Sequence, residues 1–413
     1  LLIYTNCGKV EDMSQFQQGF ADSELRSLEK GVDEQEEPEG ADESEKYAES
    51  KETGEVLEIE EFDRENNFTS PLSLAKKVYR FCKAYRQIAY FKPSNMEPGD
   101  RFGTTVSMYG STVAVGSIGE SSNQTWITNG PNASNNNSIS NSGAVYIFEK
   151  IGGVWQQTAY IKASNTGVDD RFGGSTYTVS KSTITIDGSY MAVGVGGEDS
   201  SSTTIINGTG SALDNNGIDA GAVYLFQKVG GSWQQVAYIK ASNAEAGDYF
   251  GSEVSLSGLR LAVGSRGESS NQTWITNGST ASGANGFSDS GAVYIYEKVG
   301  SLWQQTAYIK PSNANSGYQF GSSVSLSGTQ LAVGSPFESS NQVGITNGST
   351  ASSDTSMQGE GAVYIFEKAG LTWQQTAYIK DSCPAMEFGT YFGFSVSLSG
   401  NHLVVGDPGE GTN

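Results

Sequence analysis

One order of short motifs recurs along this chain and decides what it can fold into. Phe-Gly opens each copy, and Ala-Val-Gly, Gly-Ala-Val-Tyr, Trp-Gln-Gln and Ala-Tyr-Ile-Lys follow in that order. Successive Phe-Gly pairs are 70, 78, 70 and 72 residues apart. A fixed period of this length is typical of propellers and solenoids, in which each repeat is one supersecondary unit. The pairs begin at Phe102, Phe172, Phe250, Phe320 and Phe392.

Within the copy that runs from 320 to 380, four short segments have the composition of strands. The run from Val363 to Phe366 is apolar at consecutive positions, which is typical of strands covered on both faces. Four antiparallel strands per repeat form one blade of a β-propeller. We therefore predict an all-β propeller, in which the repeated tryptophans and glycines such as Gly334 pack between blades. The four predicted strands are 323–327, 330–334, 362–367 and 372–380.

The two ends of the chain together copy one further repeat. Val78 to Phe81 and Ala89 to Lys92 copy the third and fourth strands, and Phe392 to Gly406 copies the first and second. We therefore predict four complete repeats plus one blade composed from both chain ends, which gives five blades. The alternative is a seven-bladed propeller of which this chain is a part.

Most of the negative charge precedes the repeats. The net charge is −21, and Leu1 to Glu65 carries 21 acidic and 6 basic residues. With few aromatic residues, this segment cannot bury enough apolar surface to offset the entropy lost on ordering. We predict that residues 1–75 form an acidic, mostly disordered tether and that residues 76–413 form the propeller.

The first seven residues, Leu-Leu-Ile-Tyr-Thr-Asn-Cys, resemble the end of a bacterial lipoprotein signal sequence. Cys7 is therefore a candidate lipidation site, and the expected location is extracellular or the outer cell surface. Tyr4 and Asn6 are larger than the residues usual before such a cysteine. An arbitrary fragment with an ordinary cysteine is the alternative. Like charges would extend the tether and hold the propeller away from the membrane.

At the repeated motifs the chain resembles the FG-GAP repeat family, whose members include the propeller heads of integrin α subunits. The Glu-Ser-Ser-Asn-Gln loops make it more similar to bacterial FG-GAP repeat proteins than to animal integrins. The resemblance implies an extracellular binding or adhesion module, whose partner is a protein or a glycan. The alternative is a structural module of a larger surface protein, without a ligand of its own. A lectin-like or carbohydrate-active propeller is a more distant alternative.

The resemblance also implies calcium, which integrin-type repeats bind through an Asp-rich loop between their first and second strands. The corresponding turns here, such as Ser327-Gly328-Thr329, offer no carboxylate. Calcium requires six to eight oxygen ligands, several of them carboxylates. We therefore predict that integrin-type calcium sites are absent, and we predict no other cofactor.

A second type of metal site is conceivable in the long loops that join the second and third strands. These loops have equal lengths and begin at a glutamate, and two of them carry an aspartate before the closing glycine. The alternative is that these carboxylates accept hydrogen bonds from backbone amides in turns. The candidate metal ligands are Glu198, Asp219, Glu268 and Asp289.

The same long loops are the predicted binding surface. Because strand direction alternates in a four-stranded meander, they share one rim with the connections between repeats. Amide groups beside an exposed aromatic ring suit polar partners. Trp126 and Trp274 occur in alternate repeats, and the alternative is that each ring folds back over its own loop. The candidate ligand-binding residues are Asn123, Gln124, Trp126, Asn129, Asn271, Gln272, Trp274, Asn277, Asn341 and Asn347.

Catalysis has little support in this sequence, so we predict that the protein is not an enzyme. His402 is the only histidine, and no serine or cysteine has a matching histidine and acid. The repeat marks no pair of carboxylates as exceptional, as a glycosidase would require. The acidic composition also argues against nucleic acid as a partner.

Overall fold

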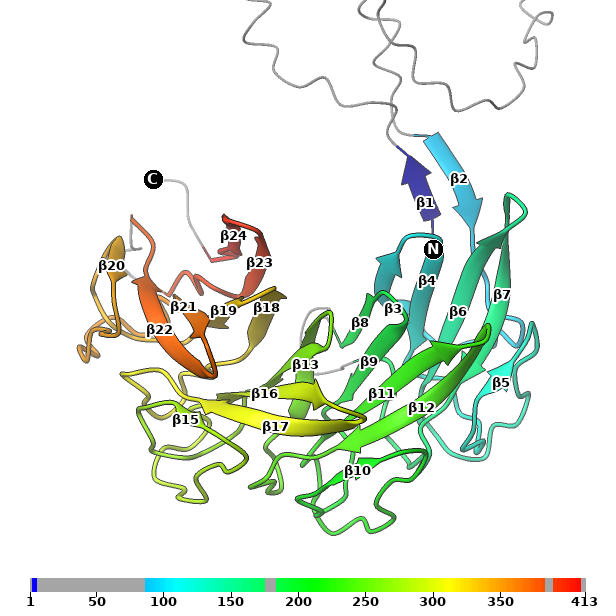
Figure 1. Ribbon diagram of the computed structural model, residues 1–413, viewed down its shortest axis with the longest axis horizontal. Helices are drawn as coiled ribbons and strands as arrows, with labels where there is room; N and C mark the ends of the chain where they lie inside the picture. The colour runs from blue at the N-terminus through cyan, green and yellow to red at the C-terminus, as the bar shows by residue number, and fades with distance from the viewer. Residues whose placement is uncertain (1, 6–85, 175–182, 383–388, 410–413) are drawn as a thin grey trace, which may run out of the picture. The chain divides into compact units, whose positions relative to one another are not determined.

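The computed structural model describes residues 2–5, 86–174, 183–382 and 389–409. All regular elements in these ranges are strands (Figure 1). They include no helix that is long and apolar enough to cross a membrane. The chain divides into two compact units, Leu1–Phe91 and Lys92–Asn413.

The described part of the first unit is a two-stranded antiparallel sheet. Its strands are β1 (Leu2–Thr5) and β2 (Arg86–Tyr90), with a bulge between Ile3 and Tyr4. A strand therefore lies inside the predicted tether. Cys7 and the rest of the tether lie outside the described residues.

The second unit contains four five-stranded sheets, which we call blades 1 to 4. Blade 1 consists of β3 (Phe102–Tyr109), β4 (Thr112–Ser117), β5 (Thr128–Asn129), β6 (Ala144–Ile151) and β7 (Val154–Ile161). Blade 2 consists of β8 (Ile184–Asp187), β9 (Tyr190–Val195), β10 (Ile205–Asn207), β11 (Ala222–Val229) and β12 (Ser232–Ile239). Blade 3 consists of β13 (Phe250–Ser257), β14 (Arg260–Ser265), β15 (Thr276–Asn277), β16 (Ala292–Val299) and β17 (Leu302–Ile309). Blade 4 consists of β18 (Ser323–Ser327), β19 (Gln330–Ser335), β20 (Ile345–Asn347), β21 (Ala362–Ala369) and β22 (Thr372–Ile379).

Each blade contains the predicted four-stranded antiparallel meander plus one short strand that was not predicted. In blade 1 the strand order is β3-β4-β6-β7-β5, so the extra strand lies on the outer edge. Thr128 and Asn129 of the long loop pair there with Tyr160 and Ala159 of β7. A free edge strand would expose unpaired backbone groups, and the returning loop covers part of that edge. The predicted all-β propeller fold is confirmed, with five strands per blade instead of four.

Apolar cores lie between neighbouring blades. The core between blades 2 and 3 joins Leu225 and Ile239 to Val254, Leu261 and Tyr294. The repeated tryptophan belongs to such a core, as predicted: Trp303 of blade 3 packs edge-on against Tyr190 of blade 2, at 5.9 Å between ring centroids. A sheet with a blade on either side, such as that of blade 2 or blade 3, is therefore covered on both faces, which explains why its strands are apolar at consecutive positions.

The glycines of Ala-Val-Gly and Phe-Gly meet where the inner strands of adjacent blades approach. A Cβ atom on Gly264 of blade 3 would lie 2.1 Å from the carbonyl oxygen of Gly321 in blade 4. Gly334 stands in the same relation to Gly393, at 2.0 Å. Only a residue without a side chain permits this approach, as predicted for Gly334.

Serine side chains join the innermost strands across the blade boundaries. The Leu326 backbone N–H donates to Ser255 Oγ of blade 3, at 2.9 Å. The Leu398 N–H donates in the same way to Ser325 Oγ, also at 2.9 Å. These bonds satisfy backbone donors on an edge that no further described strand covers.

The predicted composite blade is not assembled among the described strands. β23 (Ser395–Ser399) and β24 (His402–Gly406) form a two-stranded sheet at the predicted position of the first and second strands. The predicted fourth strand overlaps β2, whose described partner is β1. The predicted third strand, 78–81, lies outside the described residues.

The side of blade 1 that precedes it in chain order is uncovered among the described residues. Val106 and Met108 on β3 are 49% and 53% exposed, whereas their counterparts Val254 and Leu256 in blade 3 are buried. Closure of the propeller by a composite blade therefore stays a prediction.

Candidate functional site

Each long loop begins at a glutamate that is buried with the lysine of the Ala-Tyr-Ile-Lys motif. In blade 3, Lys310 Nζ donates to Glu268 Oε2 at 2.8 Å, and Tyr308 donates to Glu268 Oε1 at 2.8 Å. The ammonium group also donates to Ser290 Oγ at 2.6 Å and to the Gly291 carbonyl at 2.7 Å. All three of its protons therefore have acceptors. The same 42-residue separation joins Lys162 to Glu120, Lys240 to Glu198 and Lys380 to Glu338.

The connection from the preceding blade binds to this buried pair. Asn243 Nδ2 donates to Glu268 Oε1 at 3.1 Å, and the Tyr294 hydroxyl donates to Asn243 Oδ1 at 2.6 Å. Burial lowers the pKa of Lys310, and the negative charge of Glu268 opposes that shift. The network therefore holds together the start of the long loop, at Glu268, and the connection from the preceding blade, at Asn243.

Two of the four candidate metal ligands are engaged by these lysines. Glu198 and Glu268 each accept a hydrogen bond from an ammonium group, which already supplies the positive charge that a metal ion would bring. Asp219 and Asp289 have φ angles of 56° and 51°, and the Asp219 carbonyl accepts a bond from the Tyr249 N–H. Within the described ranges, no three His, Cys, Asp or Glu side chains are grouped to hold a metal ion. The two glutamates therefore bind lysines, and the two aspartates occupy left-handed backbone positions at the end of their loops.

In blades 1 to 3, the asparagine of the repeated Asn-Gly joins its blade to the next one. Asn277 Oδ1 in blade 3 accepts from the Trp373 N–H of blade 4 at 2.7 Å, and its Nδ2 donates to the Trp373 carbonyl at 3.3 Å. Two predicted ligand-binding residues, Asn129 and Asn277, are therefore occupied by structural bonds. The other such pairs are Asn129 with Trp233 and Asn207 with Trp303.

Replacing Asn277 by alanine should lower the free energy of unfolding by about 1–3 kcal/mol, because two backbone groups of Trp373 lose their partner. Urea unfolding followed by circular dichroism measures the change. Asn347 is the matched control, since it occupies the same position in blade 4, and neither strand of the described sheet that follows, β23 or β24, carries a tryptophan. Asn347→Ala should change stability by less than about 0.5 kcal/mol. Equal effects of the two substitutions would contradict the inter-blade role of Asn277.

Two further predicted ligand residues, Gln124 and Gln272, make contacts within the part of the long loop that carries the tryptophan. We call this part the arm; it comprises residues 123–128 in blade 1 and 271–276 in blade 3. Gln124 is buried, and its Nε2 donates to the Trp126 carbonyl at 2.8 Å and to Thr128 Oγ1 at 3.0 Å. Gln272 makes the same two bonds to the Trp274 carbonyl and to its threonine, at 2.7 and 3.0 Å. Both amides are thus part of the scaffold that presents the tryptophan.

The tryptophans themselves point into solvent. Trp126 is 60% exposed and Trp274 is 62% exposed, so neither ring folds back to be covered by its own loop. In blade 4, Gly344 takes the tryptophan position with a φ of 74°, and Gln342 still donates to Thr346 Oγ1. The loop therefore forms its arm without a tryptophan.

The remaining predicted residues lie at the surface of the same arms. The side chains of Asn123, Asn271 and Asn341 are exposed. The Asn123 backbone N–H donates to Asn136 Oδ1 at 3.3 Å, which ties the arm to the later part of its loop. These three asparagines, the likewise exposed Asn347 and the two tryptophans are the predicted residues that are exposed and lie outside the scaffold contacts described above.

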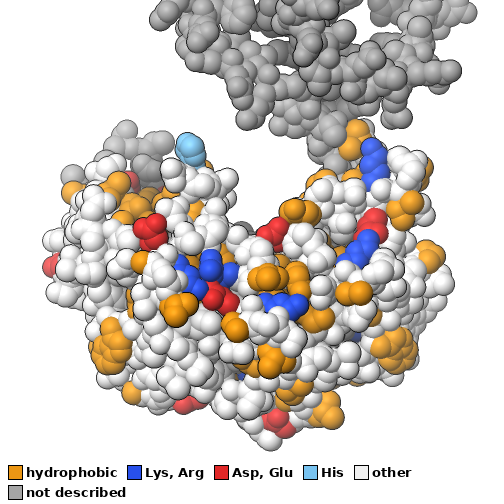
Figure 2. Space-filling model, in the orientation of Figure 1, with side chains coloured by type: hydrophobic (Ala, Val, Ile, Leu, Met, Phe, Trp, Pro, Cys, Tyr) orange, Lys and Arg blue, Asp and Glu red, His pale blue; other side chains and the backbone are white. Residues whose placement is uncertain are grey.

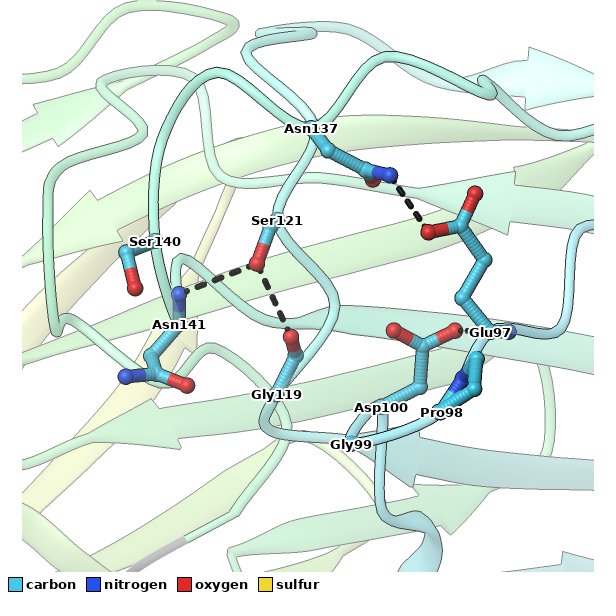
Figure 3. A pocket seen from close by; sticks show the side chains of 9 residues that line it. All are labelled: Glu97, Pro98, Gly99, Asp100, Gly119, Ser121, Asn137, Ser140 and Asn141. Carbon is cyan, nitrogen blue, oxygen red and sulfur yellow. Dashed lines mark hydrogen bonds between the residues drawn. The ribbon is translucent and has the colours of Figure 1, made fainter.

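A pocket of about 310 Å³ lies between the connection into blade 1 and the long loop of that blade. Figure 3 shows the carboxylates of Glu97 and Asp100 on one side and Ser121, Ser140 and Asn141 on the other. Asn137 Nδ2 donates to Glu97 Oε2, and the Glu97 N–H donates to Asp100 Oδ2 at 2.8 Å. None of these residues was predicted, because the carboxylates and the amides meet only when the connection and the loop fold together.

An aspartate stands two residues before the first three Phe-Gly pairs, and it is buried where the connection enters the blade. Burial raises the pKa of Asp170 to about 8 and that of Asp248 to about 7, and it also raises the pKa of Asp100. In the case of Asp170, the nearby charges of Glu198 and Asp199 raise the pKa further. The Gly167 N–H donates to Asp170 Oδ2 at 2.6 Å and partly opposes the shift.

The raised pKa of Asp170 makes the stability of the protein depend on pH. Because the folded state holds this proton more tightly than the unfolded state does, stability falls as the pH rises from about 4 through about 8. Asp170→Asn keeps a hydrogen-bond acceptor but cannot ionise. Urea unfolding at pH 5 and pH 8 should therefore show a smaller loss of stability in the variant than in the wild type. The same loss in both proteins would contradict burial of a protonated Asp170.

We compared the sequence of this chain with models of known protein families and with curated proteins. The family model described as "FG-GAP repeat" matches residues 85–148, 233–296 and 303–366. The chain therefore contains FG-GAP repeats in these three regions. A search of curated proteins found no match. FG-GAP repeats often occur in surface or adhesion proteins and are typically non-enzymatic.

The FG-GAP matches are offset from the blades of the structure. The match to 233–296 begins in the fourth long strand of blade 2 and ends in the third long strand of blade 3. One matched unit therefore contains a whole connection between blades, with Asn243, the Asp248 turn and the glutamate Glu268. The equal glutamate–lysine separation in every repeat was the signal from which the buried pair could have been predicted.

Proposed function

We propose that this FG-GAP protein is an extracellular or cell-surface binding module, which recognises a protein or a glycan through the rim that carries its long loops. The proposal rests on the exposure of Trp126 and Trp274, which are not required for their loops to fold. Gly344 in blade 4 provides the internal comparison, because its arm keeps the Gln342–Thr346 bond.

An exposed indole ring is a large apolar surface with one hydrogen-bond donor, and such rings are enriched among the residues that dominate binding energy. Around each ring the loop presents exposed amide groups, such as those of Asn123 and Asn271. The combination suits a partner that has both apolar and hydroxyl or amide groups.

The proposed location is the outer cell surface, with a lipid on Cys7 and the acidic segment as a spacer. The supporting observations are the sequence around Cys7 and the excess of negative charge before residue 65. Labelling of cells with a fatty-acid analogue, followed by mass spectrometry of the N-terminal peptide, tests the lipid. A labelled wild type and an unlabelled Cys7→Ser variant are expected.

The binding proposal is tested with an array of glycans and extracellular-matrix proteins, probed with the full chain in calcium and in chelator. The Trp126→Ala/Trp274→Ala variant should lose binding. Leu371→Ser is the matched control, because Leu371 is 87% exposed in the turn between β21 and β22 and is not part of a long loop. Binding that persists in the tryptophan variant would contradict the proposal, and loss only in chelator would point to a cation in the loops.

The second candidate function is a structural module without a ligand. It is favoured by the scaffold contacts of Gln124, Gln272, Asn129 and Asn277, which occupy four of the ten predicted ligand residues. Absence of binding to every member of the array, by a protein with a cooperative unfolding transition, would favour this function.

A further inference from the structure

Blades 1 and 3 share two features that blades 2 and 4 lack. The exposed tryptophan is present in blades 1 and 3, and Thr204 and Gly344 take its place in the other two. The pocket glutamate follows the same alternation: Glu97 in blade 1 has its counterpart at Glu245 in blade 3. Gly167 and Asn315 occupy this position in blades 2 and 4. The repeat alone does not require this two-blade pattern, because all four loops make their buried glutamate–lysine pair.

The hydrogen bonds around the blade 1 pocket recur in blade 3. Asn285 Nδ2 donates to Glu245 Oε2, as Asn137 does to Glu97. The Glu245 N–H donates to Asp248 Oδ2 at 2.9 Å, which repeats the 2.8 Å bond between Glu97 and Asp100. Ser269 makes the two bonds of Ser121: it donates to the Gly267 carbonyl at 3.1 Å and accepts from the Asp289 N–H at 3.3 Å.

One loop builds both parts of each site. The loop of blade 1 supplies Trp126 from its first half, and it supplies Asn137 and Asn141 to the pocket from its second half. The bond from the Asn123 N–H to Asn136 Oδ1 joins the two halves. In blade 3, Ala284 stands at the position of Asn136. The bond that joins the two loop halves in both blades is the one to the serine after the buried glutamate, from the Asn141 N–H to Ser121 Oγ and from the Asp289 N–H to Ser269 Oγ.

We propose that blades 1 and 3 carry two equivalent binding sites, and that their ligand is a polysaccharide without anionic groups, which engages both sites through repeated units. This inference rests on the proposed binding function and specifies its partner. The tryptophans provide the main binding contacts, and the exposed glutamates Glu97 and Glu245 determine which charge the partner can carry.

The chemistry of the site fits a neutral or amino sugar. The flat face of Trp126 or Trp274 can cover the apolar C–H face of a pyranose ring, as aromatic side chains do with other flat apolar surfaces. The oxygens of Glu97, Asp100 and Asn141 can accept hydrogen bonds from sugar hydroxyl groups. The exposed carboxylates of Glu97 and Glu245 would repel a uronate or a sulfate, and the residues after Glu65 add 25 acidic against 19 basic residues.

Duplication of the site favours a repetitive partner over a single epitope. A polymer presents the same sugar unit many times. Once one unit is bound at one tryptophan, the binding of another unit of the same polymer at the second tryptophan is intramolecular. Such linkage can raise the overall affinity by about 10²–10⁴ without any new contact. A single protein epitope would have no use for two copies of one site in alternate blades.

The experiment uses the full chain and isothermal titration calorimetry. The probes are length series of laminari-, cello- and chito-oligosaccharides, the polymers laminarin and mixed-linkage glucan, and alginate as the anionic polymer. Trp126→Ala, Trp274→Ala and the double variant are compared with wild type, and Leu371→Ser is the control. Thermal unfolding of each variant checks the fold, which should persist because blade 4 folds with glycine at this position.

The proposal predicts two equal sites for a short neutral oligosaccharide, one site in either single variant and none in the double variant. For the polymer, either single variant should lower the affinity by about 10-fold or more. One site in the wild type would overturn the duplication but leave the binding function standing. Tryptophan-dependent binding of alginate alone, or of array proteins alone, would overturn the assignment to non-anionic glycans. Binding unaffected in the double variant would overturn the proposed function itself.

Discussion

Replacing Glu268 by glutamine is expected to lower the free energy of unfolding by about 3–5 kcal/mol. The substitution leaves the ammonium group of Lys310 buried, with its side chain 0% exposed and its charged partner removed. The remaining acceptors, Ser290 Oγ and the Gly291 carbonyl, are neutral. Urea unfolding at pH 7, followed by tryptophan fluorescence, measures the loss.

The double variant Glu268→Gln/Lys310→Met separates the cost of an unpaired charge from the value of the pair. Replacing both partners removes the buried charge, so this variant should recover most of the stability lost in Glu268→Gln. If the double variant is as unstable as the single one, the destabilisation comes from packing and not from an unpaired lysine. An unchanged stability of Glu268→Gln would show that the pair is not buried.

Replacing Gly264 by alanine is expected to destabilise the protein by about 1–3 kcal/mol or more. The new Cβ atom would lie 2.1 Å from the carbonyl oxygen of Gly321, a backbone atom in the turn that enters the next blade, so no flexible side chain can give way. The inner strands of blades 3 and 4 must therefore move apart, which also loosens the apolar core between them. Thermal unfolding by circular dichroism records the change.

Gly283 is the control for this substitution. It lies in the long loop of blade 3, and a Cβ atom there would have no neighbour within 4 Å. Gly283→Ala should leave stability unchanged or raise it slightly, because it restricts only the unfolded chain. A loss from Gly264→Ala no larger than that from Gly283→Ala would mean that the blades do not approach as closely as described.

The fold could be predicted from the sequence because each strand carries its own local pattern. The segments 323–327 and 330–334 are strands in the structure within one residue of the prediction. Val363 to Phe366 is apolar at consecutive positions because both faces of β21 are covered, and the period of the motifs repeats this arrangement. The short strands such as β5 were not predicted, because two or three residues form a strand only where an exposed edge is available to pair with.

The candidate site was predicted less completely. Trp126 and Trp274 were identified as residues that the repeat does not require, and the structure places them at the surface. Asn129 and Gln124 have the same polar character as true ligand-binding residues, yet their side chains bond to the scaffold. Sequence shows the chemistry of an amide group but does not show which backbone atom it meets.

By itself, the sequence determined which segments of each repeat form strands, which glycines let neighbouring blades approach and where the long loops leave each blade. These properties depend on residues close together in the chain, so local patterns record them. Only the tertiary structure decided that Glu268 binds Lys310, that Asn277 binds the backbone of Trp373 and that Glu97 shares a pocket with Asn137. Each of these contacts joins residues far apart in the chain, and such residues meet only after the strands have paired and the blades have packed.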